Sequence, residues 1–176
     1  MRIGGELTLE YISSDTNIWI DFNTISSTEI PFRLPCTYIM YHEALENEVL
    51  SPAGLVSDLT RLGLVGVEID TEEFFYTYEL AEKYKRLSVY DRVALAIAKK
   101  RNIMLLTGDN ALRKAAIQEG VSVMGTIGLL DRLYEEGRIK RREYEKCLRD
   151  FLKHPERRLP KNELEDRLKK LKGGPK

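Results

Sequence analysis

The sequence predicts an α/β fold, a three-layer α/β/α sandwich around a mainly parallel sheet, followed by a C-terminal helical extension. Short apolar runs with the character of strands alternate with amphipathic helical patterns over most of the chain, which is the order that builds helix-covered parallel sheets. After Gly137 only helical patterns remain, and the composition becomes strongly basic. We therefore expect an α/β domain over residues 1–137 and a basic helical extension over residues 138–176.

The composition narrows the classes of protein to which this chain can belong. Its 176 residues, 43% of them hydrophobic, can bury one core of ordinary size. No apolar run approaches the roughly 20 residues that span a membrane, and no signal-peptide pattern opens the chain, so we expect a cytoplasmic protein without membrane association. Cys36 and Cys147 share no metal-binding spacing with each other or with a histidine, so we expect two reduced, structural cysteines.

Charge is divided unevenly along the chain. Residues 138–176 hold fifteen lysines and arginines against seven acidic residues, so this segment is near +8 and the remainder, in a chain of zero net charge, is near −8. Such asymmetry is typical of proteins that bind nucleic acid or another acidic partner. It is equally typical of a basic tail that folds against its own acidic body.

The first elements follow from local patterns. Alternating apolar and polar residues predict a strand over residues 7–14. Asp15 ends this strand and opens a helix, where a side-chain cap is an alternative role for its carboxylate. The next elements are expected in the order helix 16–22, loop 24–35, helix 38–49, helix 51–62 and strand 64–69.

A helix that starts at Thr71 carries a stripe of residues that we expect to face the core, namely Phe74, Phe75, Tyr78 and Ala81. Ser88 and Asp91 have the spacing of a capping box and predict a second helix over residues 88–101. The apolar run over residues 103–106 is too short for a helix and predicts a strand buried on both faces. Asp109 follows this strand and is placed to cap the next helix.

The C-terminal part is predicted to contain one more strand and then only helices. The strand covers residues 121–124, and the helix after it is stopped by Gly137. The apolar stripe over residues 144–152 would serve the core of one chain or a dimer interface equally well. A last basic helix carries Leu164, Leu168 and Leu171 at helical spacing.

Four carboxylates are expected at the carboxyl edge of the sheet, where open α/β folds bind ligands. They are Asp15, Asp91, Asp109 and, from the helix over residues 38–49, Glu43, whose close rivals are Glu46 and Glu48. Because like charges raise each other's pKa values, a divalent cation would relieve their repulsion. Oxygen ligands favour Mg²⁺ or Mn²⁺ over zinc, and the chemistry that such a site favours is phosphoester hydrolysis. Each aspartate has a structural alternative as a helix cap.

Residues 14–22, SDTNIWIDF, resemble the opening motif of the PIN-domain nucleases. The spacing onward to Glu43, to residues 88–91 and to residues 106–109 resembles the other acidic motifs of that family in order. The glycine-rich run over residues 120–130 is similar to one branch of the family. The resemblance covers residues 9–136, so the basic extension lies outside it.

The resemblance implies the α/β/α fold and metal-dependent cleavage of RNA. It implies that Asp15, Glu43, Asp91 and Asp109 hold Mg²⁺ or Mn²⁺, with supporting hydrogen bonds from Asn17 and Thr107. Because the family includes VapC-type toxins of toxin–antitoxin pairs, it also implies an antitoxin protein and a second copy of the chain as partners. The basic residues expected to hold the RNA by its phosphates are Arg92, Arg113 and Lys114, or those of the basic extension. The alternative function is a PIN-fold module that binds RNA or a protein without turnover.

Overall fold

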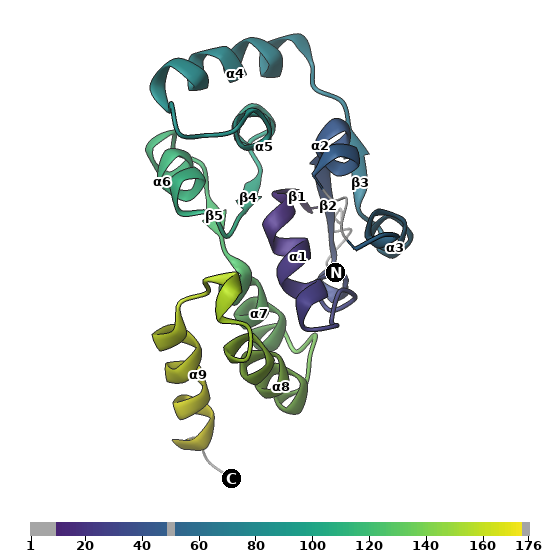
Figure 1. The fold of residues 1–176 in the computed structure, drawn as a ribbon, viewed down its shortest axis with the longest axis vertical. Helices are drawn as coiled ribbons and strands as arrows, with labels where there is room; N and C mark the ends of the chain where they lie inside the picture. Colours follow the sequence, from purple (N-terminus) through teal and green to yellow (C-terminus); the bar gives the residue numbers. More distant parts are fainter. Residues whose placement is uncertain (1–9, 49–51, 174–176) are drawn as a thin grey trace, which may run out of the picture.

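The computed structural model describes residues 10–48 and 52–173, and Figure 1 shows strands and helices that alternate through most of the chain. The first elements are β1 (Glu10–Ser14), α1 (Thr16–Thr24), η1 (Pro31–Arg33), β2 (Cys36–Tyr41), α2 (His42–Asn47), α3 (Leu55–Leu62), β3 (Val65–Val67) and α4 (Thr71–Lys83). They are followed by α5 (Val89–Lys100), β4 (Met104–Leu106), α6 (Asn110–Gln118), β5 (Val123–Met124) and α7 (Thr126–Glu135). The C-terminal segment adds α8 (Arg141–Leu152), η2 (Pro155–Arg157) and α9 (Lys161–Gly173).

The described strands form one parallel sheet in the order β3-β2-β1-β4-β5. The first strand lies in the centre, where Ile12 is in register with Tyr38 of β2 on one side and with Met104 of β4 on the other. Because every strand runs in the same direction, the residues that follow β1 and β4 meet at one edge of the sheet. The predicted parallel sheet is confirmed.

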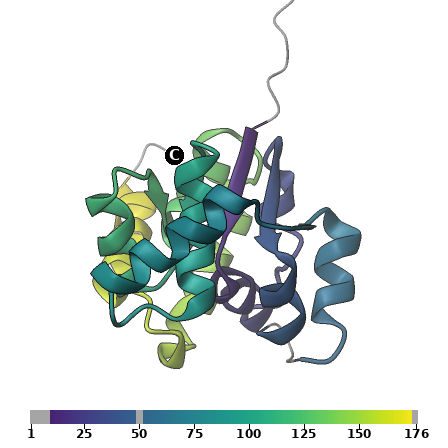
Figure 2. The same ribbon diagram turned by 90° about the horizontal axis from the view of Figure 1, so that it is seen from above.

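Helices cover both faces of the sheet (Figures 1 and 2). On one face, residues of α1, α3, α7, α8 and α9 bury a core that includes Trp19 and Phe22. On the other face, α4, α5 and α6 bury a second core. The neighbours Leu105 and Leu106 of β4 are both fully buried, one in each core, as the alternation of side chains along a strand requires. The predicted three-layer α/β/α architecture is therefore confirmed.

The strand predicted over residues 7–14 is confirmed as β1 over residues 10–14, and residues 7–9 lie outside the described residues. Its alternation of apolar and polar residues does not lead to alternating buried and exposed side chains. Ile12, Ser13 and Ser14 are all at most 1% exposed, because the central strand has helices on both faces. The two serines are satisfied by backbone carbonyls. Ser13 donates to the carbonyl of Ala94, and Ser14 donates to that of Ile39.

The prediction of a single helix over residues 38–49 is wrong. Residues 36–41 form the strand β2, and α2 occupies only residues 42–47. Tyr38, Ile39 and Met40 are at most 3% exposed, which is typical of a strand that lies between two helical layers. A helix in their place would turn part of this apolar run toward water. Residue 49 lies outside the described residues.

The aromatic stripe of α4 faces outward, contrary to the prediction. The exposed fractions are 45% for Phe74, 62% for Phe75 and 61% for Tyr78. The helix is rotated so that Glu73 is fully buried, where its carboxylate accepts two hydrogen bonds from Arg101 at 2.6 and 3.0 Å. This ion pair lies between residues 28 positions apart, so the rotation of α4 is a tertiary property that its own pattern does not contain.

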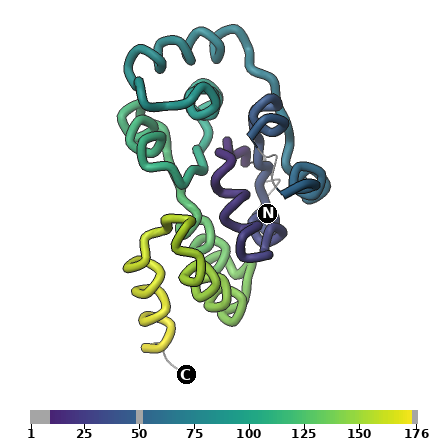
Figure 3. Tube along the Cα trace, in the orientation of Figure 1, coloured from purple at the N-terminus to yellow at the C-terminus, as the bar shows by residue number. Residues whose placement is uncertain are grey.

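The C-terminal helices pack onto the same core as α1 and α7, and Figure 3 shows α7, α8 and α9 side by side. The buried members of the stripe on α8 are Tyr144, Cys147, Leu148 and Phe151. Phe151 meets Phe22 of α1 edge to face at 5.7 Å between ring centroids. The stripe therefore serves the core of a single chain. Both cysteines are free, and none of the described helices is long and apolar enough to cross a membrane.

Part of the basic C-terminal segment is neutralised by the acidic body. Arg157 pairs with Asp21 at 2.7 Å and Arg167 pairs with Asp131 at 2.7 Å. These pairs show that the basic tail is folded in part against the protein's own acidic body, which explains part of the charge asymmetry. Other arginines of the segment remain exposed, among them Arg158.

Candidate functional site

An acidic pocket of about 400 Å³ lies at the carboxyl edge of the sheet. Its lining comes from the residues that follow β1 and β4, from the end of α2 and from the start of α5. The lining residues are Asp15, Thr16, Asn17, Glu48, Ser88, Asp91 and Asp109. Three of the four carboxylates expected from the sequence thus share one pocket with Glu48.

Asp15 is the buried member of this pocket. It occupies the N-cap position of α1, but its side chain makes no capping hydrogen bond. Instead, its Oδ2 accepts hydrogen bonds from Thr107 Oγ1 at 3.0 Å and from Asn17 Nδ2 at 3.3 Å. The side chains predicted to support the site, Asn17 and Thr107, thus both contact this carboxylate.

The charge of Asp15 is held in an unfavourable place. The residue is 7% exposed, and no lysine, arginine or histidine of the described residues forms an ion pair with it. Burial is the main reason that the pKa of Asp15 rises to about 6, and the negative charge of Asp91 adds to the shift. A carboxylate kept under such conditions is typical of sites that bind cations or handle protons.

Asp91 caps a helix and faces the pocket at the same time. Its Oδ2 accepts a hydrogen bond from the backbone N–H of Ser88 at 2.8 Å, and Ser88 Oγ accepts one from the N–H of Asp91 at 3.0 Å. This is the predicted capping box, and α5 begins where it was expected. Since the cap uses Oδ2, Oδ1 has no hydrogen-bond partner among the described residues and is available to a ligand.

Asp109 caps α6 with one carboxylate oxygen, because its Oδ1 accepts a hydrogen bond from the N–H of Leu112 at 2.8 Å. The backbone N–H of Asp109 in turn donates to Thr107 Oγ1 at 3.0 Å. Thr107 is fully buried and also donates to Asp15. One hydroxyl therefore links the two strand ends that carry aspartates, which the hydrogen bond from the N–H of Asp15 to the carbonyl of Leu106 at 3.0 Å also joins.

Glu48 is the glutamate that faces the pocket. Thr16 Oγ1 donates a hydrogen bond to its Oε2 at 2.8 Å, and partial burial and the charge of Asp91 raise its pKa. Glu43 is exposed in the first turn of α2 and does not line this pocket. Glu46 is exposed as well, with Oε1 at 3.4 Å from Nε2 of His42. Because α2 begins at residue 42 rather than 38, the helical face inferred from the sequence selected a different glutamate.

The three basic residues expected to contact RNA lie in different surroundings. Arg92 follows Asp91 on α5, and its Nε donates to the carbonyl of Ser88 at 3.2 Å. Arg113 lines a separate cavity on the far side of the 107–110 loop. Lys114 is exposed on α6 and lines neither cavity. Only Arg92 is bonded directly to the edge of the acidic pocket.

The donor set of the pocket suits a hard divalent cation. Its four ionisable side chains are carboxylates, the ligands that Mg²⁺ and Mn²⁺ prefer, and the buried charge of Asp15 lacks a positive partner among the described residues. In the arrangement of the described residues, no three side chains of His, Cys, Asp or Glu stand close enough together to surround one ion. An ion would therefore draw the carboxylates closer or be bridged to them by water.

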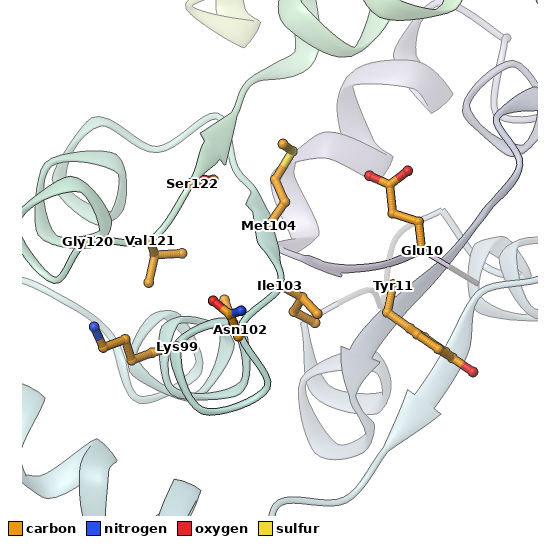
Figure 4. A pocket seen from close by; sticks show the side chains of 10 residues that line it. Glu10, Tyr11, Lys99, Asn102, Ile103, Met104, Gly120, Val121 and Ser122 are labelled. Carbon is orange, nitrogen blue, oxygen red and sulfur yellow. The ribbon is translucent and has the colours of Figure 1, made fainter. Parts of the chain in front are cut away.

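A different cavity, of about 450 Å³, opens at the opposite edge of the sheet (Figure 4). It lies where β1 and β4 begin and includes Glu10 and Lys99 in its lining. Glu10 is paired with Arg132 at 2.7 Å, and Lys99 Nζ donates to the carbonyl of Glu119 at 2.6 Å. Because both charged groups already have partners, this cavity offers no free reactive group comparable to the acidic pocket.

Fold and site together define an α/β/α protein with carboxylates gathered at the carboxyl edge of a parallel sheet. The family model described as a PIN domain matches residues 12–173. The chain belongs to the PIN-domain family, as the resemblance of its acidic motifs predicted. The match includes α8 and α9, which lie beyond the region covered by that resemblance. No curated protein and no solved structure matched the chain.

Proposed function

We propose that this chain is a metal-dependent endoribonuclease that hydrolyses RNA phosphodiesters at the acidic pocket. The observation that carries the proposal is the convergence of Asp15, Glu48, Asp91 and Asp109 on one pocket at the carboxyl edge of the sheet. Membership of the PIN-domain family supports the same class of activity.

We assign the metal ligands to these four side chains, with Glu48 in the role expected for Glu43. The chemistry that a bound Mg²⁺ or Mn²⁺ supplies is the activation of water and the stabilisation of the departing oxygen. Asp91 and Asp109 keep one carboxylate oxygen free for this purpose while the other caps a helix. Glu48 is held toward the pocket by its hydrogen bond from Thr16.

Asp15 is the centre of the proposed ligand set. Thr107 and Asn17 both donate to its Oδ2, so the orientation of the carboxylate is fixed and Oδ1 remains available. These hydrogen bonds favour the ionised form and oppose the effect of burial on the pKa. The buried carboxylate thus stays ready to bind a cation near neutral pH, where a group with a still higher pKa would hold a proton.

The RNA strand approaches a pocket of like charge, so it requires positive side chains nearby. Arg92 is hydrogen-bonded to the carbonyl of Ser88 at the edge of the pocket. Arg113 lines the cavity on the other side of the 107–110 loop, and Lys114, the next residue, is exposed. We assign contacts with phosphates to these residues. Such contacts supply affinity and orientation rather than sequence selection.

A toxin role in a toxin–antitoxin pair, with an antitoxin protein and a second copy of the chain as partners, belongs to this proposal in its narrower form. The stripe on α8 is taken up by the core, so a dimer would use another surface. Co-expression with the product of an adjacent small gene, followed by size-exclusion chromatography, tests both partners together.

The experiment that tests the enzyme is cleavage of a mixture of single-stranded and structured RNA in Mn²⁺, in Mg²⁺ and in EDTA. The wild type is compared with Asp91→Asn, in which the amide oxygen preserves an acceptor for the capping box. The matched control is Asp58→Asn, since Asp58 is an exposed carboxylate on α3 that does not line the pocket. All three proteins are purified identically and checked for the same far-UV spectrum.

Metal-dependent cleavage by the wild type and by Asp58→Asn, with loss of cleavage in Asp91→Asn, supports the proposal. Equal cleavage by all three proteins contradicts the assigned site and indicates a contaminant. RNA binding without cleavage by any of them would instead favour a PIN-fold binding module.

A further inference from the structure

A second cavity lies directly beside the acidic pocket, on the other side of the loop that follows β4. Its volume is about 380 Å³, and its lining includes Gly108 and Asn110, the two neighbours of Asp109. Since consecutive residues are only 3.8 Å apart along the chain, the two cavities are separated by the thickness of one residue of backbone. The two cavities therefore lie next to each other, on either side of the loop that carries Asp109.

The charge of this second cavity is opposite to that of the acidic pocket. Three arginines line it, namely Arg113 of α6, Arg158 after η2 and Arg167 of α9. Arg167 is already paired with Asp131 and Glu163. Arg113 and Arg158 form no ion pair with any acidic residue of the described ranges, and both are exposed. Two free guanidinium groups thus border one cavity.

The position of Arg158 is built into the fold. The residue before it, Arg157, is anchored in the protein by its ion pair with Asp21 at 2.7 Å and by a contact of its Nη2 with the carbonyl of Asn17 at 3.4 Å. Arg158 itself has a φ of +56°, a left-handed conformation that is uncommon for residues other than glycine. With Arg157 held by Asp21 and Asn17, the left-handed backbone at the next residue places Arg158 in the lining of the cavity.

Space for Arg113 is provided by a residue without a side chain. A Cβ atom on Gly125 would lie 3.1 Å from Nη1 of Arg113 and 3.6 Å from the carbonyl oxygen of Thr107. Any larger residue at position 125 would therefore press on the guanidinium group. The absence of a side chain at Gly125 thus leaves room for the guanidinium group of Arg113 beside the backbone at this edge of the cavity.

We propose that this second cavity is a binding site for a backbone phosphate of the RNA strand, with Arg113 and Arg158 as its ligands. The proposal rests on the ribonuclease function proposed above and adds where the strand lies. A planar guanidinium group matches the oxygens of a phosphate and remains charged at every physiological pH. The strand then runs from the acidic pocket, over the loop at Gly108, to the two arginines. The C-terminal segment accordingly takes part in substrate binding.

The test measures binding apart from cleavage. A fluorescent single-stranded RNA of mixed sequence is titrated with the protein in EDTA, and anisotropy is recorded at several salt concentrations. The proteins are the full-length wild type, Arg113→Ala, Arg158→Ala and the double variant. The matched control is Arg142→Ala, which removes an exposed arginine from α8 that lines neither of the two cavities. Thermal unfolding establishes that all of the variants are folded.

Each single variant is expected to bind the RNA about tenfold more weakly at moderate salt. The slope of log affinity against log salt concentration should become shallower by about 0.7 for each arginine removed. Arg142→Ala should keep the slope of the wild type. The proposal would be overturned if the double variant bound RNA as tightly as the wild type, or if Arg142→Ala lost as much affinity as the other variants. It would also be overturned if the wild type did not bind RNA.

Failure of this proposal and failure of the ribonuclease function give different results. If metal-dependent cleavage is found but the arginine variants bind RNA normally, the strand follows another path across an active enzyme. If the arginine variants lose binding but no protein cleaves RNA, the phosphate site stands on a protein without that activity.

Discussion

The hydroxyl of Thr107 donates a hydrogen bond to the carboxylate of Asp15 at 3.0 Å, between residues that are 92 positions apart in the chain. The same hydroxyl accepts a hydrogen bond from the N–H of Asp109. These contacts hold the ends of the two central strands together at the point where the acidic pocket opens. They also place a negative charge where burial opposes it, and this conflict leads to the first prediction.

Asp15→Asn should make the metal-free protein more stable at neutral pH. The ordinary pKa of 3.8 applies to the unfolded chain and a pKa of about 6 to the folded one. Between these values the folded state binds more protons, so stability falls as the pH rises, and the loss is complete above about pH 6. The variant lacks this loss and should gain about 3 kcal/mol at most. Urea unfolding in EDTA at pH 4 and pH 7.5 measures the difference, and an equal free energy of unfolding for both proteins at pH 7.5 would contradict it.

Thr107→Val should destabilise the protein by about 1 to 3 kcal/mol, since it leaves a buried carboxylate and a backbone N–H without one partner each. Thr107→Ser keeps the hydroxyl and is the control. Because the hydrogen bond from Thr107 lowers the pKa of Asp15, the valine variant should lose stability over a range that extends to higher pH. Urea unfolding as a function of pH measures both effects, and an unchanged pH range in Thr107→Val would count against the proposed role of the hydroxyl.

Glu48→Gln should weaken Mn²⁺ binding by about 10- to 100-fold and reduce cleavage, since Glu48 lines the acidic pocket. Glu43→Gln and Glu46→Gln should bind the ion like the wild type, because both glutamates are exposed outside that pocket. Isothermal titration calorimetry with Mn²⁺ compares the three variants. Loss of binding in Glu43→Gln alone would restore the assignment made from the sequence.

Arg157→Met should cost about 3 to 5 kcal/mol, because it leaves the carboxylate of Asp21 buried and unpaired. Asp21 has a side chain that is only 3% exposed, and Thr126 Oγ1 donates to its other oxygen at 2.5 Å. Adding Asp21→Asn to Arg157→Met removes the stranded charge, so the double variant should recover part of the loss. A double-mutant cycle in urea measures this coupling, and a double variant less stable than Arg157→Met would refute the explanation.

Much of the fold could be predicted from the sequence because the relevant signals are local. The capping box of Ser88 and Asp91 and the cap made by Asp109 each join groups three residues apart, so their spacing alone predicted where α5 and α6 begin. The short apolar run before Thr107 predicted a strand for a similar reason. The family match over residues 12–173 agrees with the fold that these patterns predicted.

The predictions from the sequence failed where contacts between residues far apart in the chain decide the structure. An isolated apolar run before His42 is compatible with a helix or a strand, and only burial between two helical layers selects β2. The buried face of α4 carries Glu73, Tyr76 and Leu80, with Glu73 paired to Arg101, and this orientation turns Phe74 and Phe75 to solvent. The hydrophobic pattern of α4 contains no trace of that partner.

By itself, the sequence determined the α/β class, the starts of α5 and α6 and the strand-end aspartates, because these depend on contacts within one turn or on the period of a strand. Only the tertiary structure decided that Glu48 rather than Glu43 faces the acidic pocket and that Arg158 reaches a cavity beside Asp109. Both outcomes depend on where separate elements stop and how they pack. Those are properties of the whole chain, and no short window of residues encodes them.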